Sequence, residues 1–168
     1  MTSAETQVAS YFAKYEPPMA KLGKALRAKL RARLPGLSEI VYVYENLEAL
    51  VISYSPTEHG KDGLCGLKLT PRGAELFFGQ GAQLSKSDPS KLLQGSGGVR
   101  HVVLNTAADF DRADIEALMT AALKLAKLRL DPGAKGAVII RAESQKKRAA
   151  QRKAAGPGSA RRTAKARS

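Results

Sequence analysis

The chain has 168 residues, enough for one domain with a hydrophobic core, and 43% of its residues are apolar. It has no run of 18 apolar residues, so we expect no membrane-spanning helix. The net charge of +13 is concentrated at one end, because the residues from Arg141 onward carry ten Lys and Arg against the single Glu143. That leaves +4 for residues 1–140, and we expect a domain over residues 1–142 followed by a basic tail over 143–168.

The opening residues, MTSAETQVAS, lack the basic and then apolar pattern of a secretion signal, so the expected compartment is the cytoplasm. The one cysteine, Cys65, cannot form a disulfide within the chain. It lies in an apolar segment and has no base beside it in sequence. A buried, inert thiol is therefore favoured over a nucleophile.

Two helices are predicted at the start of the chain. Residues 4–15 have apolar residues at helical spacing, with Ser3 as a plausible N-cap. A second helix is predicted over residues 17–34, because proline is tolerated in a first turn and Pro35-Gly36 ends the pattern. Its many Lys and Arg residues suit either contact with nucleic acid or lipid or an ordinary solvated surface, and the second interpretation is favoured.

Five strand-like segments follow, at residues 40–45, 49–55, 64–70, 74–79 and 99–104. Short links join the first four into two hairpins, and Thr70-Pro71-Arg72-Gly73 is typical of a turn. A helix is then predicted from Asp111 to about Leu130, and a last short strand at 137–141. The expected fold is α+β: an antiparallel sheet of about five to six strands packed on N- and C-terminal helices, plus a disordered basic C-terminal tail.

The tyrosines of the first strand-like segment need a separate interpretation. Tyr42 and Tyr44 share one face of the strand with Ile40. The presence of Ile40 favours a core face, with the hydroxyl groups reaching its edge. A ligand-lining role for the two tyrosines is the alternative.

Five segments carry a family resemblance: VASYFAKYEPPMAKLGKALRAKLRARLPG, YVYENLEALVISYSPTE, LKLTPRGAELFF, LLQGSGGVRHVVL and GAVIIRAESQKKR, spanning roughly residues 7–148. In this order they resemble the YdhG-like domain family, a small bacterial family of largely unknown function. The resemblance implies an antiparallel sheet packed on helices, and some members are described as frataxin-like iron chaperones. The sequence departs from the family at Gly98, where a Lys often follows the GSG turn.

The Gly-rich segment 94–98, followed by Arg100 and His101, is the main candidate for a site. Flexible backbone N–H groups there could cradle a phosphate or carboxylate, although the segment lacks a Walker motif and precedes a strand instead of a helix. A plain turn entering a strand is the alternative. Because Arg100 and His101 are adjacent in a strand, they are expected on opposite faces.

We therefore expect a non-enzymatic binding module for a small anionic ligand or a protein partner. The site is expected in a cleft between the sheet and the long loop 80–98. The predicted ligand-binding residues are Arg72, Phe78, Gln94, Ser96, Arg100 and His101. No catalytic residue and no cofactor are expected, since the sequence shows neither a paired acid and base nor a cofactor motif.

The basic tail predicts an alternative function, nonspecific contact with nucleic acid by an accessory protein of the nucleoid. The predicted nucleic-acid-binding residues are Lys146, Lys147, Arg148, Arg152, Lys153, Arg161 and Arg162. The tail has no aromatic residues on which bases could stack, so base readout is not expected. A merely solubilising tail is the plainer alternative.

Iron delivery is a third possibility, which the family resemblance implies and the composition opposes. A frataxin-like iron role normally requires an acidic ridge, and the domain carries a net positive charge. The densest acidic group is Asp109, Asp111, Asp114 and Glu116. These residues could attract a hard cation, but capping of one helix explains them equally well and is favoured. No metal site is expected, because His59 and His101 are the only histidines.

Overall fold

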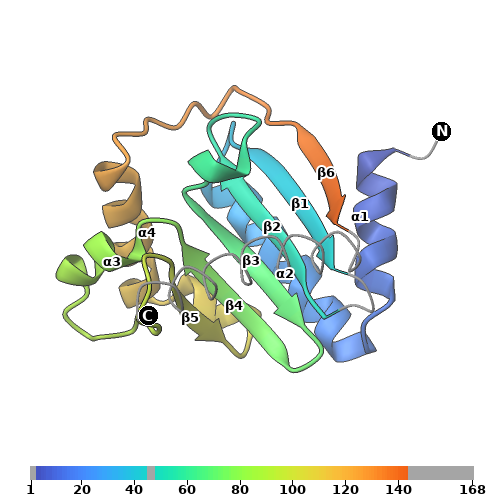
Figure 1. Cartoon of the computed structure of the whole chain (residues 1–168), viewed down its shortest axis with the longest axis horizontal. Coiled ribbons are helices and arrows are strands. Elements are labelled where there is room, and N and C mark those ends of the chain that lie inside the picture. The colour runs from blue at the N-terminus through green and yellow to red at the C-terminus, as the bar shows by residue number, and fades with distance from the viewer. Residues whose placement is uncertain (1–2, 45–47, 144–168) are drawn as a thin grey trace, which may run out of the picture.

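The computed structural model describes residues 3–44 and 48–143, and its strands form a six-stranded mixed sheet in the order β5-β4-β3-β2-β1-β6 (Figure 1). The elements are α1 (Ala4–Ala13), α2 (Pro17–Arg33), β1 (Ser38–Tyr44), β2 (Leu50–Ser55), η2 (Gly60–Asp62), β3 (Cys65–Thr70), β4 (Gly73–Phe78), α3 (Gly81–Leu84), η3 (Ser85–Ser87), β5 (Arg100–Leu104), η4 (Ala107–Asp111), α4 (Ala113–Leu125) and β6 (Val138–Glu143). The α+β class predicted from the sequence is confirmed.

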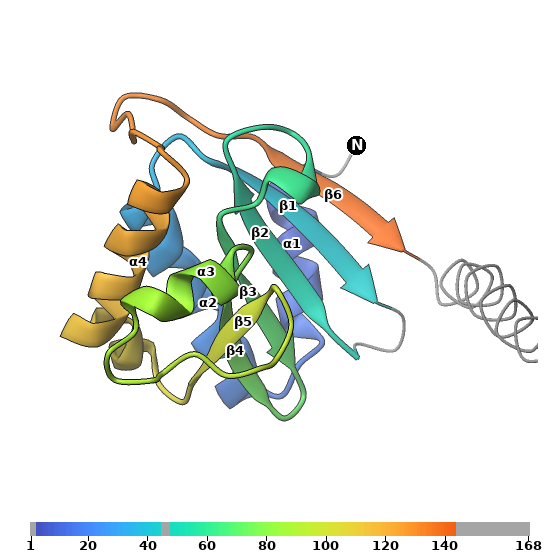
Figure 2. The same ribbon diagram turned by 60° about the vertical axis from the view of Figure 1, so that its left-hand side comes forward.

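The long helices lie on one side of the sheet, and the core is between the two layers. Figure 1 shows α2 behind the strands, and Figure 2 shows the same layers from another side. Phe12 of α1, Leu26 of α2 and Leu76 of β4 are buried in this core. Helix α2 approaches its neighbours closely at Gly23, where a Cβ would come within 2.7 Å of the Phe12 ring. Opposite the helices, the sheet has a face that no long helix of residues 3–44 and 48–143 covers.

The first two helices begin as the sequence predicts. The Ser3 hydroxyl accepts a hydrogen bond from the Thr6 N–H at 3.2 Å and so caps α1. Helix α2 starts with Pro17 and Pro18, whose missing N–H groups would have no partner in a first turn. The predicted N-cap and both helices are therefore confirmed.

Strand β6 makes the sheet mixed, whereas a wholly antiparallel sheet was expected. It runs parallel to β1, with Ile139 opposite Ile40, while the remaining neighbours are antiparallel. Short turns force adjacent strands to be antiparallel, but a parallel pair needs a long connection. The chain reaches β6 through α4 and the segment 126–137, which crosses one end of the sheet (Figure 1). No hairpin therefore sets the direction of β6.

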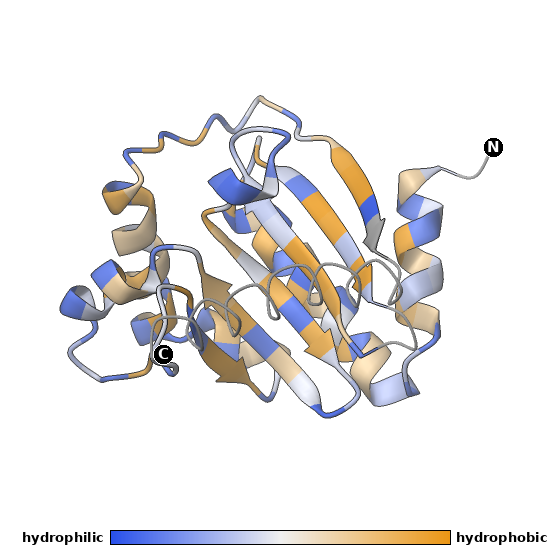
Figure 3. Ribbon diagram, viewed as in Figure 1, coloured by the Kyte–Doolittle hydropathy of each residue, from blue (hydrophilic) through white to orange (hydrophobic). Residues whose placement is uncertain are grey.

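The face of β1 that packs on the helices is the opposite of the predicted one. Val41 is paired with Ile52, which belongs to the core, and Glu39 shares the face of Val41. Tyr42 instead points to the helix-free face, where the loop 56–63 covers it so closely that a Cβ at Gly60 would overlap its hydroxyl. The prediction that the tyrosines lie on the core face is wrong. Figure 3 shows hydrophilic residues interspersed with hydrophobic ones along β1 and β3.

The long segment 80–98 folds as α3 and η3 and then turns around the buried Asp88. The Asp88 carboxylate accepts hydrogen bonds from the backbone N–H groups of Leu92 at 3.0 Å and Leu93 at 2.8 Å. Gln94 then forms an isolated bridge to His101, with N···O distances of 2.7 and 3.0 Å. This bridge occupies part of the outer edge of β5, which would otherwise present unpaired backbone groups.

Candidate functional site

A groove of about 570 Å³ lies on the helix-free face of the sheet. The side chains that give it its chemistry are Tyr44, Val51, Lys68, Arg72, Phe77 and His101. They come from five strands and one turn, so residues that are far apart in the sequence meet here. The volume lies within the range of about 300–1,000 Å³ that is usual for small-molecule sites.

Strand register places these side chains together. Phe77 of β4 is opposite His101 of β5, and Lys68 of β3 is opposite Glu75 of β4. Their neighbours along the strands, such as Leu67 and Leu76, are buried in the core. Because side chains alternate between the two faces of a strand, Lys68, Phe77 and His101 all point away from the helices.

The β3–β4 turn holds Arg72 at the rim of the groove. The Thr70 hydroxyl accepts a hydrogen bond from the Arg72 N–H at 3.2 Å and donates one to the Gly73 carbonyl at 3.3 Å. The Arg72 side chain is exposed. Its backbone is therefore fixed while its guanidinium can reach a ligand.

Positive and negative groups are balanced around the groove. Lys68 and Arg72 are the cations, and Glu48 and Glu75 are the carboxylates. His101 has its Nε2 atom 3.8 Å from Glu75 Oε1, so its imidazole lies beside that carboxylate. Apolar surface beside the charges would suit a small organic anion with an apolar part.

Two of the six predicted ligand-binding residues, Arg72 and His101, line this groove. Phe78 does not, because it is fully buried on the opposite face of the sheet. Arg100 is directly opposite Phe78 and shares its face, and its Nε donates a hydrogen bond to the Gly97 carbonyl at 2.7 Å. The expected separation of Arg100 from His101 is confirmed.

The remaining two predicted residues, Gln94 and Ser96, lie in the exposed Gly-rich segment. Gln94 acts through its backbone, which holds His101 in place. Gly95 has a φ of +108°, a conformation that favours glycine, and the Gly98 carbonyl accepts a hydrogen bond from the Ala82 N–H at 2.9 Å. This segment is thus tied to α3 as well as to β5.

Sequence reasoning missed Lys68 and Phe77, although a usable signal was present. The turn Thr70–Gly73 sets the register of the β3–β4 hairpin. In that register Lys68 and Phe77, each flanked by two core residues, fall on the same outward face. Selecting Phe78 instead of Phe77 placed one predicted residue on the wrong side of the sheet for this groove.

A buried ionic network lies on the helix side and gave no signal in the sequence. Glu39 is only 3% exposed, and its two carboxylate oxygens accept hydrogen bonds from Nε and Nη2 of Arg27, both at 2.9 Å. The Tyr54 hydroxyl donates to the same carboxylate at 2.9 Å. Arg27 also pairs with Glu5 of α1 at 3.0 Å. The network therefore joins α1, α2, β1 and β2.

Burial and charge shift the pKa values within this network. Burial, followed by the adjacent Glu39 carboxylate, raises the pKa of Tyr54 well above its ordinary value of 10.0. Burial alone would lower the pKa of Arg27, but its bonds to Glu39 and Glu5 outweigh that effect and raise it. Tyr54 is therefore neutral and Arg27 charged at neutral pH. These residues join the elements of the fold.

Helix α2 uses most of its cations within the protein. Four of its six Lys and Arg residues form ion pairs, namely Arg27, Lys29, Arg31 and Arg33. Lys29 pairs with Asp111 and Arg33 pairs with Glu116. Two of the four acidic residues considered as metal ligands therefore take part in ion pairs. This pairing supports the structural interpretation of the helix surface.

The other acidic candidates also have local roles. Asp109 forms a capping box with Thr106, and hydrogen bonds from the backbone N–H groups of Asn105 and Thr106 lower its pKa. Asp114 pairs with Arg112 at 2.5 Å. Over residues 3–44 and 48–143, no three His, Cys, Asp or Glu side chains gather as a metal site would require. The acids of η4 and α4 thus serve caps and ion pairs.

Cys65 is buried, as predicted, at the start of β3. Burial raises the pKa of its thiol from 9.0 to about 12. The thiolate, which is the nucleophilic form, is therefore scarce at neutral pH.

Fold and groove together define a class of α+β protein with helices on one face of its sheet and a polar groove on the other. Comparison with known proteins finds no matching family model, no matching curated protein and no matching solved structure. The resemblance to the YdhG-like family therefore stays a prediction. Among the helices in the described part of the chain, none combines the length and the apolarity needed to cross a bilayer.

Proposed function

We propose that the protein is a non-enzymatic binding module that holds a small organic anion in the groove on the helix-free face of the sheet. The observation that supports this function is the meeting of Lys68, Arg72 and His101 in one groove that also has an apolar wall. The ligand's charge lies beside Lys68 and Arg72. Its apolar part lies against Phe77 and Val99.

The balance of charge around the groove favours a compact anion. Glu48 and Glu75 at the groove oppose a broad negative surface, because a second negative group placed near either carboxylate would be repelled. A ligand with one anionic group at the Lys68 and Arg72 side and an uncharged remainder avoids this repulsion. A reducing compartment such as the cytoplasm is the proposed setting, in line with the single unpaired thiol.

Phenyl phosphate is a suitable probe, because it combines a compact anion with one aromatic ring. We expect it to shift the backbone NMR signals of β3, β4 and β5 in a saturable way and to bind more tightly than inorganic phosphate. Replacing Lys68→Gln or Arg72→Gln is expected to weaken binding by about fivefold each, the effect of one exposed charge-assisted hydrogen bond of about 1 kcal/mol.

A charge-matched control separates this effect from the general charge of the protein. Lys24→Gln removes an exposed cation from α2, on the other side of the sheet, and should leave phenyl phosphate binding unchanged. Arg100→Gln should also leave it unchanged, since Arg100 faces the helix side. Equal affinity of the Lys68→Gln, Arg72→Gln and Lys24→Gln variants would remove the proposal.

A second candidate function, nonspecific binding of nucleic acid, is favoured by the concentration of charge in the tail. The candidate residues Lys146, Lys147, Arg148, Arg152, Lys153, Arg161 and Arg162 lie outside the described residues. Helix α2, the most basic helix of the domain, pairs four of its six cations internally. The sequence from Arg141 onward has ten cations against one acid, so the tail is the proposed contact with phosphate groups.

A further inference from the structure

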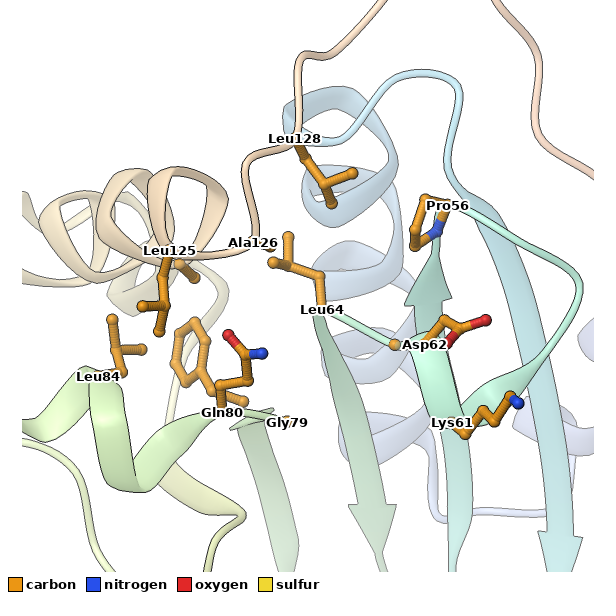
Figure 4. A pocket seen from close by; sticks show the side chains of 13 residues that line it. Pro56, Lys61, Asp62, Leu64, Gly79, Gln80, Leu84, Leu125, Ala126 and Leu128 are labelled. Atoms are coloured by element: carbon orange, nitrogen blue, oxygen red, sulfur yellow. The ribbon is translucent and has the colours of Figure 1, made fainter.

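A second cavity, of about 300 Å³, lies at the end of the sheet between α3 and α4. We name it the end pocket. Its apolar lining comes mainly from Leu64, Phe78, Leu84, Leu125 and Leu128 (Figure 4). It is on the helix side of the sheet, so it is separate from the groove that contains Lys68 and His101.

The inner wall of the end pocket belongs to the hydrophobic core, whereas its rim is exposed. Leu64, Phe78 and Leu84 are buried and belong to the core. Leu125, at the last turn of α4, is 39% exposed and is one of the few large apolar side chains of the described residues that are so accessible. An exposed leucine next to a cavity with an apolar wall provides a surface that a ligand can cover.

The rim is held by a residue in an unfavourable backbone conformation. Lys127 has a φ of +56°, in the left-handed region that L-residues seldom adopt. In this conformation the Leu128 N–H bonds to the Leu123 carbonyl at 3.0 Å, and the chain turns so that Leu128 lines the pocket. Leu128 thus closes one side of the cavity, and the turn that places it there requires the unfavourable backbone conformation of Lys127.

The polar groups at the end pocket indicate what kind of ligand it takes. Figure 4 shows the carboxamide of Gln80 pointing between Leu125 and Leu64, while the charged ends of Lys61 and Asp62 point away from the cavity. Asp62 is also engaged by the Thr57 hydroxyl at 2.7 Å. Among the polar side chains, the one that faces inward is therefore a neutral amide, and burying a charged ligand group beside it would be unfavourable.

We propose that the end pocket binds a small, uncharged and mainly apolar molecule of up to two fused rings, oriented by one hydrogen bond to Gln80. An apolar cavity of about 150 Å³ holds benzene in another protein, so a cavity twice as large accommodates a two-ring compound. The Gln80 amide can donate or accept a hydrogen bond, and it selects molecules with one N–H, O–H or carbonyl group. This site goes beyond the anion groove and does not depend on it.

Indole and its hydrocarbon analogue indene test the proposal, because they have nearly the same shape and only indole carries an N–H group. We expect both to shift the NMR signals of residues 78–84 and 122–128 of the full chain saturably. Ala126→Phe places a ring at the rim and should weaken both ligands at least tenfold. Gln80→Leu should weaken indole by about fivefold and leave indene unchanged or tighter.

Gln83→Leu is the matched control, since Gln83 lies exposed in α3, three residues after Gln80, and does not line the pocket. It should bind both compounds like the unaltered chain. Three results would overturn the proposal: no saturable shift at these residues, equal binding after Ala126→Phe, or equal loss of indole and indene after Gln80→Leu. Because Gln80 is exposed, its substitution should not disturb folding, so the comparison holds even if Ala126→Phe fails to fold.

Discussion

At the scale of single residues, the placement of Glu39 is the clearest departure from ordinary sequence patterns. A glutamate is seldom buried unless it is paired, and here it occupies the core face of β1. Arg27 makes this possible with two hydrogen bonds, and Tyr54 donates a third. The desolvation of both charges offsets much of the attraction between them, so the net stabilisation by the pair is much smaller than the attraction itself.

Removal of one partner should nevertheless be strongly destabilising. Glu39→Ala leaves Arg27 buried with only Glu5 as a counter-ion, and we expect the free energy of unfolding to fall by about 3 kcal/mol. The double variant Glu39→Leu with Arg27→Leu removes both charges and should recover most of this loss. Urea unfolding followed by circular dichroism measures both changes.

Arg31→Ala serves as the control for Glu39. The Arg31 side chain is 49% exposed and pairs with Glu5 at 2.9 Å and with Glu39 at 3.5 Å. Exposed pairs of this kind contribute less than about 1 kcal/mol. A Glu39→Ala variant no less stable than Arg31→Ala would contradict the view that Glu39 is the essential acid of the network.

Glu39 also explains why one prediction from the sequence was wrong. With Ile40 and two tyrosines on one face and Glu39 on the other, polarity alone selects the tyrosine face as the core. In the structure the Glu39 face packs on the core instead, where Arg27 pairs with the carboxylate. Arg27 is twelve residues earlier, on α2, and contacts Glu39 only in the folded protein. No local pattern encodes that contact.

At the scale of elements, the end of α4 lacks the glycine that usually marks a helix C-terminus in the sequence. Helices commonly end with glycine in the left-handed conformation, and here Lys127 occupies that position. The hydrogen bonds of the motif are nevertheless formed, from Lys127 to Lys124 at 3.1 Å and from Leu128 to Leu123 at 3.0 Å. Without a glycine, the sequence predicted that this helix would continue to about Leu130.

Lys127→Gly should therefore stabilise the protein. Glycine adopts the left-handed conformation without steric cost, and part of that gain is lost because glycine is also more flexible in the unfolded chain. We expect a net increase of about 0.5 kcal/mol in the free energy of unfolding, measured by urea denaturation. Lys124→Gly, inside the last turn of the same helix, should lower it by about 1 kcal/mol. A loss of stability in the Lys127→Gly variant would show that the lysine side chain has a structural role there.

Elements joined by short turns were the ones that the sequence predicted well. The hairpin at Thr70–Gly73 and the helix that starts at Pro17 have punctuating residues with a known mechanism. The direction of β6 and the separation of Phe78 from Arg72 depend instead on long connections and on strand register. The groove thus became visible only once the strands were aligned, and Arg72 and His101 are the two predicted residues that line it.

At the scale of the whole molecule, the distribution of charge separates two kinds of cation. Most of the cations of α2 form ion pairs, with Glu5, Glu39, Asp111 and Glu116 as their partners. The net charge of +4 over residues 1–140 is therefore spread over a surface that already contains many ion pairs. From Arg141 onward the sequence contains ten cations and a single acidic residue, and this segment accounts for most of the net charge of +13.

If this charge binds nucleic acid, its removal should change both the affinity and the salt dependence. We compare the full chain with a variant in which Lys146, Lys147, Arg148, Arg152, Lys153, Arg161 and Arg162 are all replaced by Gln. Each phosphate contact contributes about 0.9 to the slope of log affinity against log salt, so the seven substitutions should reduce the steepness by up to about 6. Affinity for a short DNA duplex at about 50 mM salt should fall more than tenfold.

A second variant, in which Lys and Arg are exchanged at the same seven positions, keeps the charge and alters the side chains. It should bind the duplex like the unaltered chain, because contact with phosphate groups requires charge and not one particular residue. Fluorescence anisotropy with two unrelated duplex sequences measures the affinities, which should be equal for both sequences in the absence of base readout. If the Gln variant binds as tightly as the full chain, or if the full chain does not bind at about 50 mM salt, the tail has no role in nucleic-acid binding.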